Sequence, residues 1–215
     1  IKNKALRTLC LLNPGKSKSY IQNALTAKNN PQLSSALGCL VAVGTPESLK
    51  ETLPFLKGGN PLIISESIEQ LAQLEATKIP EEIKSALKEV VYKKDPGLVA
   101  LISELATQKG WKDFVKALSD IYPVYNTDET SETKSTLVSA LGQLGSDAEI
   151  PLLNTALKDN SKQVISAAAK AIKQITGSDP NILLPLNNRV LEITPTYEQV
   201  KGAFSREVLI KTNRG

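Results

Sequence analysis

The fold is constrained above all by an apolar pair that returns every thirty-odd residues. In each pair two Leu or Ile residues stand three positions apart, and the successive spacings are 31, 31, 34, 39 and 31 residues. A further Leu or Ile follows each of the first five pairs after 12 or 13 residues. Such a period is typical of stacked helical hairpins, each of which shelters the next. The pairs are Leu6/Leu9, Leu37/Leu40, Ile68/Leu71, Ile102/Leu105, Leu141/Leu144 and Ile172/Ile175, and the residues that follow are Ile21, Leu53, Ile83, Leu118 and Leu157.

Local signals around these pairs indicate helices. Leu137, Leu141 and Leu144 recur at helical spacing, so they share one face. A capping residue precedes Pro at positions 30, 45, 60 and 95, and Gly follows several of the segments. Ser146-Asp-Ala-Glu149 has the pattern of a capping box. We expect helices over about 2–12, 17–28, 31–43, 46–57, 61–76, 80–94, 96–108, 111–122, 131–144, 147–158 and 161–176.

The segment Asp159–Gly177 carries the pattern that identifies a family. It contains Asp159, Val164, an Ala-rich run and a closing Gly177. It resembles a HEAT repeat, as found in armadillo-like and phycobilisome-lyase-type arrays. The resemblance covers residues 1–177 and implies an all-α fold, a right-handed α-α superhelix of about five to six hairpins. The family often has Arg where this chain has Ile165, and that arginine helps to tie neighbouring repeats together.

The last part of the chain, 178–215, departs from the repeat. Pro180, Pro185 and Pro195 interrupt it, so we expect an irregular capping segment and linker. The final residues, 207–215, resemble the first strand of a cyclophilin-type prolyl isomerase, which implies that a catalytic domain follows outside this chain. The alternative is an ordinary terminal β segment or disorder. The chain begins at Ile1 and contains no Met, so we expect it to be an excised or processed piece.

Enzyme chemistry finds little support in the sequence. The chain has no His, which excludes Ser-His-Asp and Cys-His nucleophile systems and His-containing zinc sites. The Gly-Lys-Ser run at 15–17 lacks the remainder of a phosphate-binding loop and indicates a turn and helix cap. Cys10 and Cys39 are expected to be buried free thiols, with a bridge between neighbouring helices as the alternative. We therefore predict no catalytic residues, cofactor or metal.

The charge distribution leaves a nucleic-acid partner open as an alternative. The net charge is +4, and the first 46 residues hold six basic side chains and no acidic one. Aromatic residues for base stacking are few, at 4%. No stretch of about 18 apolar residues occurs, so we expect no membrane-spanning segment.

We expect the chain to be a non-enzymatic scaffold that binds a protein or peptide through the concave face and the 122–132 loop. This loop accounts for the 39-residue spacing, and insertions in repeat proteins map to surface loops. Tyr122 and Tyr125 beside Asp128 and Glu129 suit a basic peptide; the alternative is a loose acidic loop with Tyr122 against the core.

Lysines of the second helices form the other candidate surface. If they face the concavity, they make a basic stripe; otherwise they are solvated surface. Trp111 is either a stacking platform or a core anchor. The alternatives for the whole chain are an accessory HEAT module of a larger enzyme and a nucleic-acid binder with a basic concave face. The candidate stripe comprises Lys50, Lys57, Lys84, Lys88, Lys112, Lys116 and Lys158.

Overall fold

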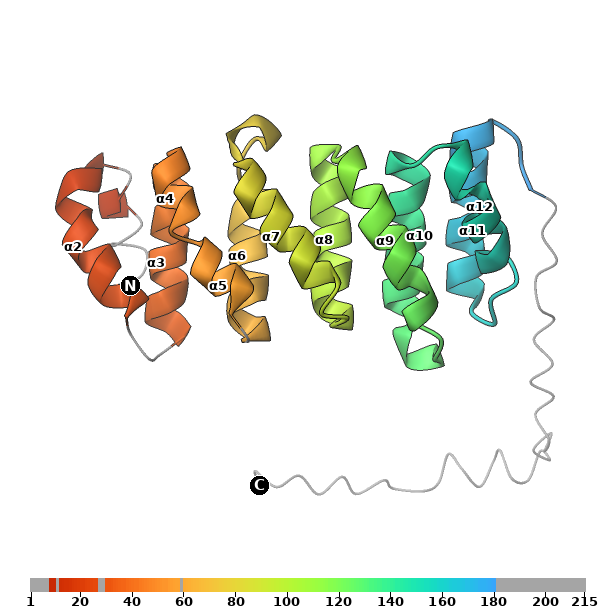
Figure 1. Ribbon diagram of the computed structural model, residues 1–215, viewed down its shortest axis with the longest axis horizontal. Helices are drawn as coiled ribbons and strands as arrows, with labels where there is room; N and C mark the ends of the chain where they lie inside the picture. The colour runs from red at the N-terminus through yellow and green to blue at the C-terminus, as the bar shows by residue number, and fades with distance from the viewer. Residues whose placement is uncertain (1–7, 11, 27–29, 59, 181–215) are drawn as a thin grey trace, which may run out of the picture. The chain divides into compact units, whose positions relative to one another are not determined.

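The structure is a computed structural model, which describes residues 8–10, 12–26, 30–58 and 60–180 of the 215-residue chain. The chain divides into two compact units, Ile1–Leu184 and Pro185–Gly215. In the described residues, which all belong to the first unit, every regular element is a helix and no strand occurs (Figure 1). The expected all-α fold is thus confirmed for this part. The interpretations of 181–215, including the cyclophilin resemblance, lie outside the described residues.

The first helices of the hairpins pack against one another in chain order. Contacts run from α3 to α6, from α6 to α8, from α8 to α10 and from α10 to α12. The helix α2 precedes them and packs on α3. The four apolar pairs from Leu37/Leu40 to Leu141/Leu144 are buried where these helices meet their neighbours. The bounds are α2 Pro14–Leu25, α3 Asn30–Val43, α6 Pro61–Ala72, α8 Pro96–Lys109, α10 Ser131–Leu144 and α12 Lys162–Thr176.

The second helices run obliquely in front of the first in the view of Figure 1. Contacts link α5 to α7 and α7 to α9, and α11 packs on α12. Short 3-10 turns extend or connect several of these helices. The bounds are α4 Pro46–Lys50, α5 Leu53–Lys57, α7 Glu81–Val91, α9 Val115–Ile121, α11 Ile150–Ala156, η1 Ala76–Lys78, η2 Lys112–Phe114, η3 Tyr122–Val124, η4 Asp128–Thr130 and η5 Asp147–Glu149.

The repeated Leu and Ile positions form the core. Ile68, Ile102 and Leu141 are almost fully buried, and so are Ile83 and Leu118 of the second helices. One continuous apolar cluster extends from α3 to α12, and a smaller one joins α2 to α3. The predicted repeat register is therefore confirmed at these positions. Among the described helices, none has the length and hydropathy needed to cross a membrane.

Most helix starts follow the expected capping chemistry. The side chains of Thr45, Asn60 and Asp95 each accept a hydrogen bond from a backbone N–H two or three residues later. Ser146 and Glu149 form the predicted capping box, which opens η5 ahead of α11. These residues satisfy backbone N–H groups that a helix start leaves unpaired.

One expected helix is divided. The prediction of a single helix over 46–57 is wrong, because α4 ends at Lys50 and α5 begins at Leu53. Pro54 has no N–H to donate to an earlier carbonyl, and the Thr52 hydroxyl donates to the Leu49 carbonyl at 2.6 Å. The break lets α4 pack on α3 while α5 packs on α6.

A disulfide closes the N-terminal end of this unit. Cys10 and Cys39 are bonded, with their Cα atoms 5.6 Å apart, and both residues are fully buried. The expectation of free thiols is therefore wrong, and the alternative of a bridge between neighbouring helices holds. The bridge joins the helical residues 8–10 to α3, within the small cluster that also contains Ile21, Ala36 and Leu40.

Candidate functional site

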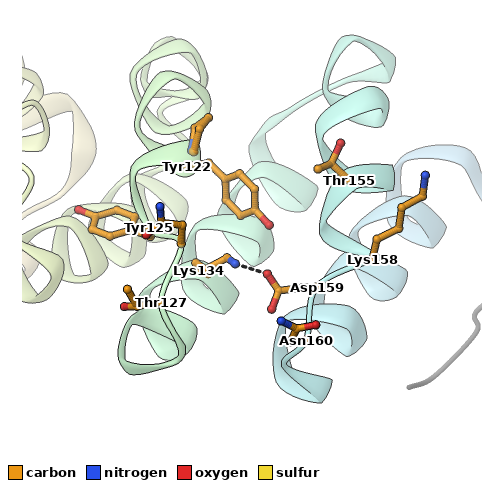
Figure 2. Close-up of a pocket in the computed structure, with 10 residues that line it drawn as sticks. Tyr122, Tyr125, Thr127, Lys134, Thr155, Lys158, Asp159 and Asn160 are labelled. Atoms are coloured by element: carbon orange, nitrogen blue, oxygen red, sulfur yellow. Dashed lines mark hydrogen bonds and ion pairs between the residues drawn. The ribbon is translucent and has the colours of Figure 1, made fainter. Parts of the chain in front are cut away.

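A polar pocket opens where the segment after α9 faces the turn between α11 and α12 (Figure 2). Its volume is about 370 Å³. Residues from three places in the chain form its walls: the 122–127 segment, the first turn of α10, and the end of α11 with the following turn. The lining residues are Tyr122, Pro123, Tyr125, Asn126, Thr127, Lys134, Thr155, Lys158, Asp159 and Asn160.

An ion pair holds the two sides of this pocket together. Lys134 on α10 pairs with Asp159, and their side chains are only 11% and 12% exposed. The Lys134 ammonium also lies 5.7 Å from the ring centroid of Tyr122, a cation–π arrangement. Asp159 in addition accepts a hydrogen bond from the Ser161 N–H at 2.9 Å. Both charges are thus occupied, which makes this pair a fixed wall of the pocket.

The two tyrosines of the expected loop belong to the core. Tyr122 is 7% exposed and Tyr125 is 4% exposed, and both join the main apolar cluster. Tyr122 therefore lies against the core, as the alternative for this loop stated, and contact of the tyrosines with a peptide stays a prediction. Burying two large rings offsets the entropic cost of ordering this insertion. Glu129 is exposed, and the side chain of Asp128 lies outside the described residues.

Burial raises the pKa of both phenols. The pKa of Tyr122 rises to about 12, first because of burial and second because of the Asp159 carboxylate. The pKa of Tyr125 also rises to about 12, again through burial and then through the charge of Asp95. The Tyr125 hydroxyl has no hydrogen-bond partner among the described residues. The folded state therefore favours the neutral form of each phenol.

These shifts predict an alkaline transition. A raised phenol pKa contributes to the stability of the folded state. This contribution is complete below pH 10.0, the ordinary pKa of tyrosine, and is lost as the pH rises toward about 12. We expect the circular dichroism signal at 222 nm to fall between these values, together with the appearance of phenolate absorbance at 295 nm. A Tyr122→Phe, Tyr125→Phe double variant controls for lysine deprotonation and should unfold at higher pH. Subtracting the absorbance of the double variant isolates the phenolates of Tyr122 and Tyr125, and a difference that appears near pH 10 with the helices intact would contradict the prediction.

A second cluster surrounds Trp111. The Trp111 ring is 5% exposed and stacks on Phe114 with centroids 5.3 Å apart. Lys84 lies 5.5 Å above the indole, and Lys88 lies 5.1 Å from the Phe114 centroid. Lys88 also pairs with Asp113 at 2.5 Å. Trp111 is therefore a core anchor covered by lysines, and its ring does not present an open stacking platform.

Most of the candidate stripe lysines are neutralised. Lys50 pairs with Glu82 at 2.7 Å, and Lys116 pairs with Asp120 at 2.9 Å. Lys57 and Lys84 also have carboxylate partners. These lysines therefore do not form an unbalanced basic stripe, because each cation faces an acid. Within the described residues, Lys112 and Lys158 form no ion pair and are exposed.

Several of these pairs cross from one hairpin to the next. Lys50 on α4 reaches Glu82 on α7, Lys88 on α7 reaches Asp113 beside α9, and Lys134 reaches the turn after α11. Ile165, which stands where the resembled HEAT pattern often has an arginine tie, is buried. The lysine pairs link neighbouring hairpins in its place. Since exposed ion pairs contribute little to stability, the Lys50–Glu82 pair orients its hairpins more than it stabilises them.

Sequence reasoning missed the residues that shape the pocket. Lys134 and Asp159 are 25 positions apart and carry no local motif, although Asp159 stood in the HEAT-like pattern. Thr155 and Asn160 also went unnoticed, because single polar residues at a helix end have many ordinary roles. The described residues contain no group of three or more His, Cys, Asp or Glu side chains that could hold a metal ion.

Comparisons with known proteins identify no family for this chain. No protein-family model matches the sequence, and no curated protein matches it. The function therefore has to be inferred from the pocket, the surface and the packing described above.

Proposed function

We propose that this chain is a non-enzymatic scaffold that binds a protein or peptide partner. The hairpins would form a HEAT-like right-handed superhelix, and the partner would contact its concave face and the pocket beside the 122–132 segment. The ordered contacts of α3, α6, α8, α10 and α12 support such an array. The observation that carries the proposal is the preformed polar pocket of Figure 2.

The chemistry of the pocket suits a peptide. Asn126 and Asn160 offer amide groups, Thr127 and Thr155 offer hydroxyls, and Lys158 offers an unpaired ammonium. Such groups match the N–H and C=O groups of a polypeptide backbone. The walls are held in advance by the Lys134–Asp159 pair and the buried tyrosines, which reduces the ordering cost of binding. Both charges of that pair are engaged with each other, which favours binding over acid–base chemistry at that pair.

A selection experiment tests the pocket. A phage library of random 12-residue peptides is panned on the wild-type unit, and the recovered peptides are measured on a Lys158→Glu, Asn160→Ala variant. Both residues are exposed and make no side-chain contact that holds the fold, so the variant should remain folded. We expect at least about tenfold weaker binding, the scale of losing one interface hot spot.

A matched variant on α12 controls for charge and exposure. Lys170→Glu with Ser166→Ala alters two exposed residues far from the pocket lining. It should retain the affinity of the wild type within about twofold, since surface changes outside an interface have small effects. Equal loss in both variants, or a library that yields no binder, would overturn the proposal.

The other candidate functions receive less support. Nucleic-acid binding requires unpaired cations that neutralise phosphates, whereas most lysines of the second helices already face carboxylates. An accessory role beside a catalytic domain is compatible with peptide binding, because such a module would deliver the partner. The coding sequence beyond Gly215 tests that role directly.

A further inference from the structure

The first helices carry two adjoining grooves on a side that the proposed pocket does not use. One groove, of about 300 Å³, lies between α6 and α8. Its floor is apolar, with Ile68 and Leu105, and its rims carry Glu69 and Gln73. Glu104 and Gln108 stand on the ridge of α8 and line both this groove and the next one.

The second groove, of about 400 Å³, lies between α8 and α10. Hydroxyl and amide groups line it, including Thr107, Thr136, Ser139 and Gln143. The polar groups thus change from one groove to the next. Carboxylates lie beside α6, and neutral hydrogen-bond donors and acceptors lie beside α10.

The close packing of α12 on α10 ends this run of two grooves. A Cβ atom on Gly142 would lie 2.6 Å from the Ala171 Cα, so α10 and α12 meet nearly backbone to backbone. The Gln163 side chain also donates to the Ser135 hydroxyl at 3.0 Å and bridges the two helices. Between α6 and α8 the Gln108 side chain donates to the Ala72 carbonyl at 3.4 Å, and both residues line the groove. The open surface therefore spans two helix intervals.

The charge of the grooves is unbalanced. Glu69 and Glu104 have neither an ion pair nor a side-chain hydrogen bond among the described residues. The nearest cation on α8, Lys109, donates to the carbonyls of Ala72 and Leu74 at 2.6 and 2.5 Å and caps the end of α6. Most lysines of the second helices are already paired, whereas these two groove carboxylates have no cationic partner among the described residues.

We propose that the two grooves bind an extended polypeptide segment with a Lys or Arg side chain placed between Glu69 and Glu104. This rests on the proposed scaffold function and names its partner as a basic, extended peptide. Neighbouring helices are about 8–10 Å apart and extended residues advance about 3.3 Å, so about six residues cross both grooves. The neutral groups beside α10 bond the peptide backbone, while the carboxylates select the cation.

Two peptide mixtures test this inference. Fluorescein-labelled octapeptides are randomised over Ser, Gly, Ala and Leu around a fixed central Arg or a fixed central Glu. At low salt we expect the Arg mixture to bind at least about tenfold tighter by fluorescence anisotropy, and the advantage to shrink as salt screens the charges. Amide resonances of Gln108, Thr136 and Gln143 should shift on binding.

Matched variants identify the residues responsible. The Glu69→Gln, Glu104→Gln variant should abolish the preference for Arg. The Glu47→Gln, Asp147→Asn variant should preserve it. The two variants are matched, because each removes two exposed carboxylates. Equal binding of the two mixtures by the wild type, or equal loss in both variants, overturns the inference. The inference is also overturned if a thymidine dodecamer or a second copy of the chain shifts the same amide resonances.

The outcomes separate this inference from the proposed function. If Arg-peptide binding is lost in Lys158→Glu, Asn160→Ala and kept in the groove variant, the grooves are excluded and the scaffold function stands. If neither peptide mixture nor the 12-residue library binds the wild type, both proposals fail. Loss confined to the groove variant supports the inference.

Discussion

Replacing Phe114 by alanine should lower the free energy of unfolding by about 3–5 kcal/mol, the usual cost of a large cavity in a packed core. Phe114 is fully buried in the main cluster, stacked on Trp111 and covered by the Lys88 ammonium. The substitution removes the ring from between α7 and α9 and leaves Trp111 without its partner. Urea unfolding followed by circular dichroism measures the change, and fluorescence of the single Trp reports on the cluster.

Phe55→Ala is the matched control for this effect. Phe55 lies on α5 and is partly exposed, so the same chemical change leaves a smaller cavity. We expect its cost to be clearly lower than that of Phe114→Ala. If Phe114→Ala costs less than about 1 kcal/mol, the cluster around Trp111 does not have the packing described here.

Reduction of the Cys10–Cys39 disulfide should cost about 3–4 kcal/mol, because its loop spans 29 positions and the bridge restricts the unfolded chain. The apolar cluster that it joins is small, so little other packing compensates at this end. We expect hydrogen exchange of α2 to accelerate on reduction, while α8 and α10 stay protected. Guanidinium unfolding with and without a phosphine reductant measures the stability change.

A Cys10→Ser, Cys39→Ser variant provides the control. It should show the lower stability at the outset and should not respond to the reductant. Mass spectrometry after alkylation counts free thiols in the wild type. Two alkylated cysteines under oxidising conditions, or a reductant effect that persists in the variant, would contradict the assignment.

Helix positions were largely predictable because their causes are local. Apolar residues at helical spacing decide which face is buried, and a capping side chain acts on N–H groups two or three residues away. Asp95, Asn60 and Ser146 therefore cap as expected. The division between α4 and α5 leaves no trace in the apolar period of the repeat, and Pro54 is its local signal.

The candidate site was less predictable, since it depends on which distant residues meet. The tyrosines of the 122–132 segment were identified, yet their burial follows from contacts with other hairpins. Lysine positions on the second helices were also identified, while their acidic partners lie on the next hairpin. A charge pattern along one helix does not reveal whether a neighbour will neutralise it.

The sequence by itself determined that this chain is helical, where most helices begin, and which side chains enter the core, because these depend on interactions within a few residues. Only the tertiary structure decided that Cys10 bonds Cys39, that Lys134 and Asp159 close a pocket wall, and that Glu69 and Glu104 share an open groove. The physical reason is that these contacts join residues far apart in the sequence: Gly142 lets α10 approach α12 closely, and each groove is lined by residues of two neighbouring helices.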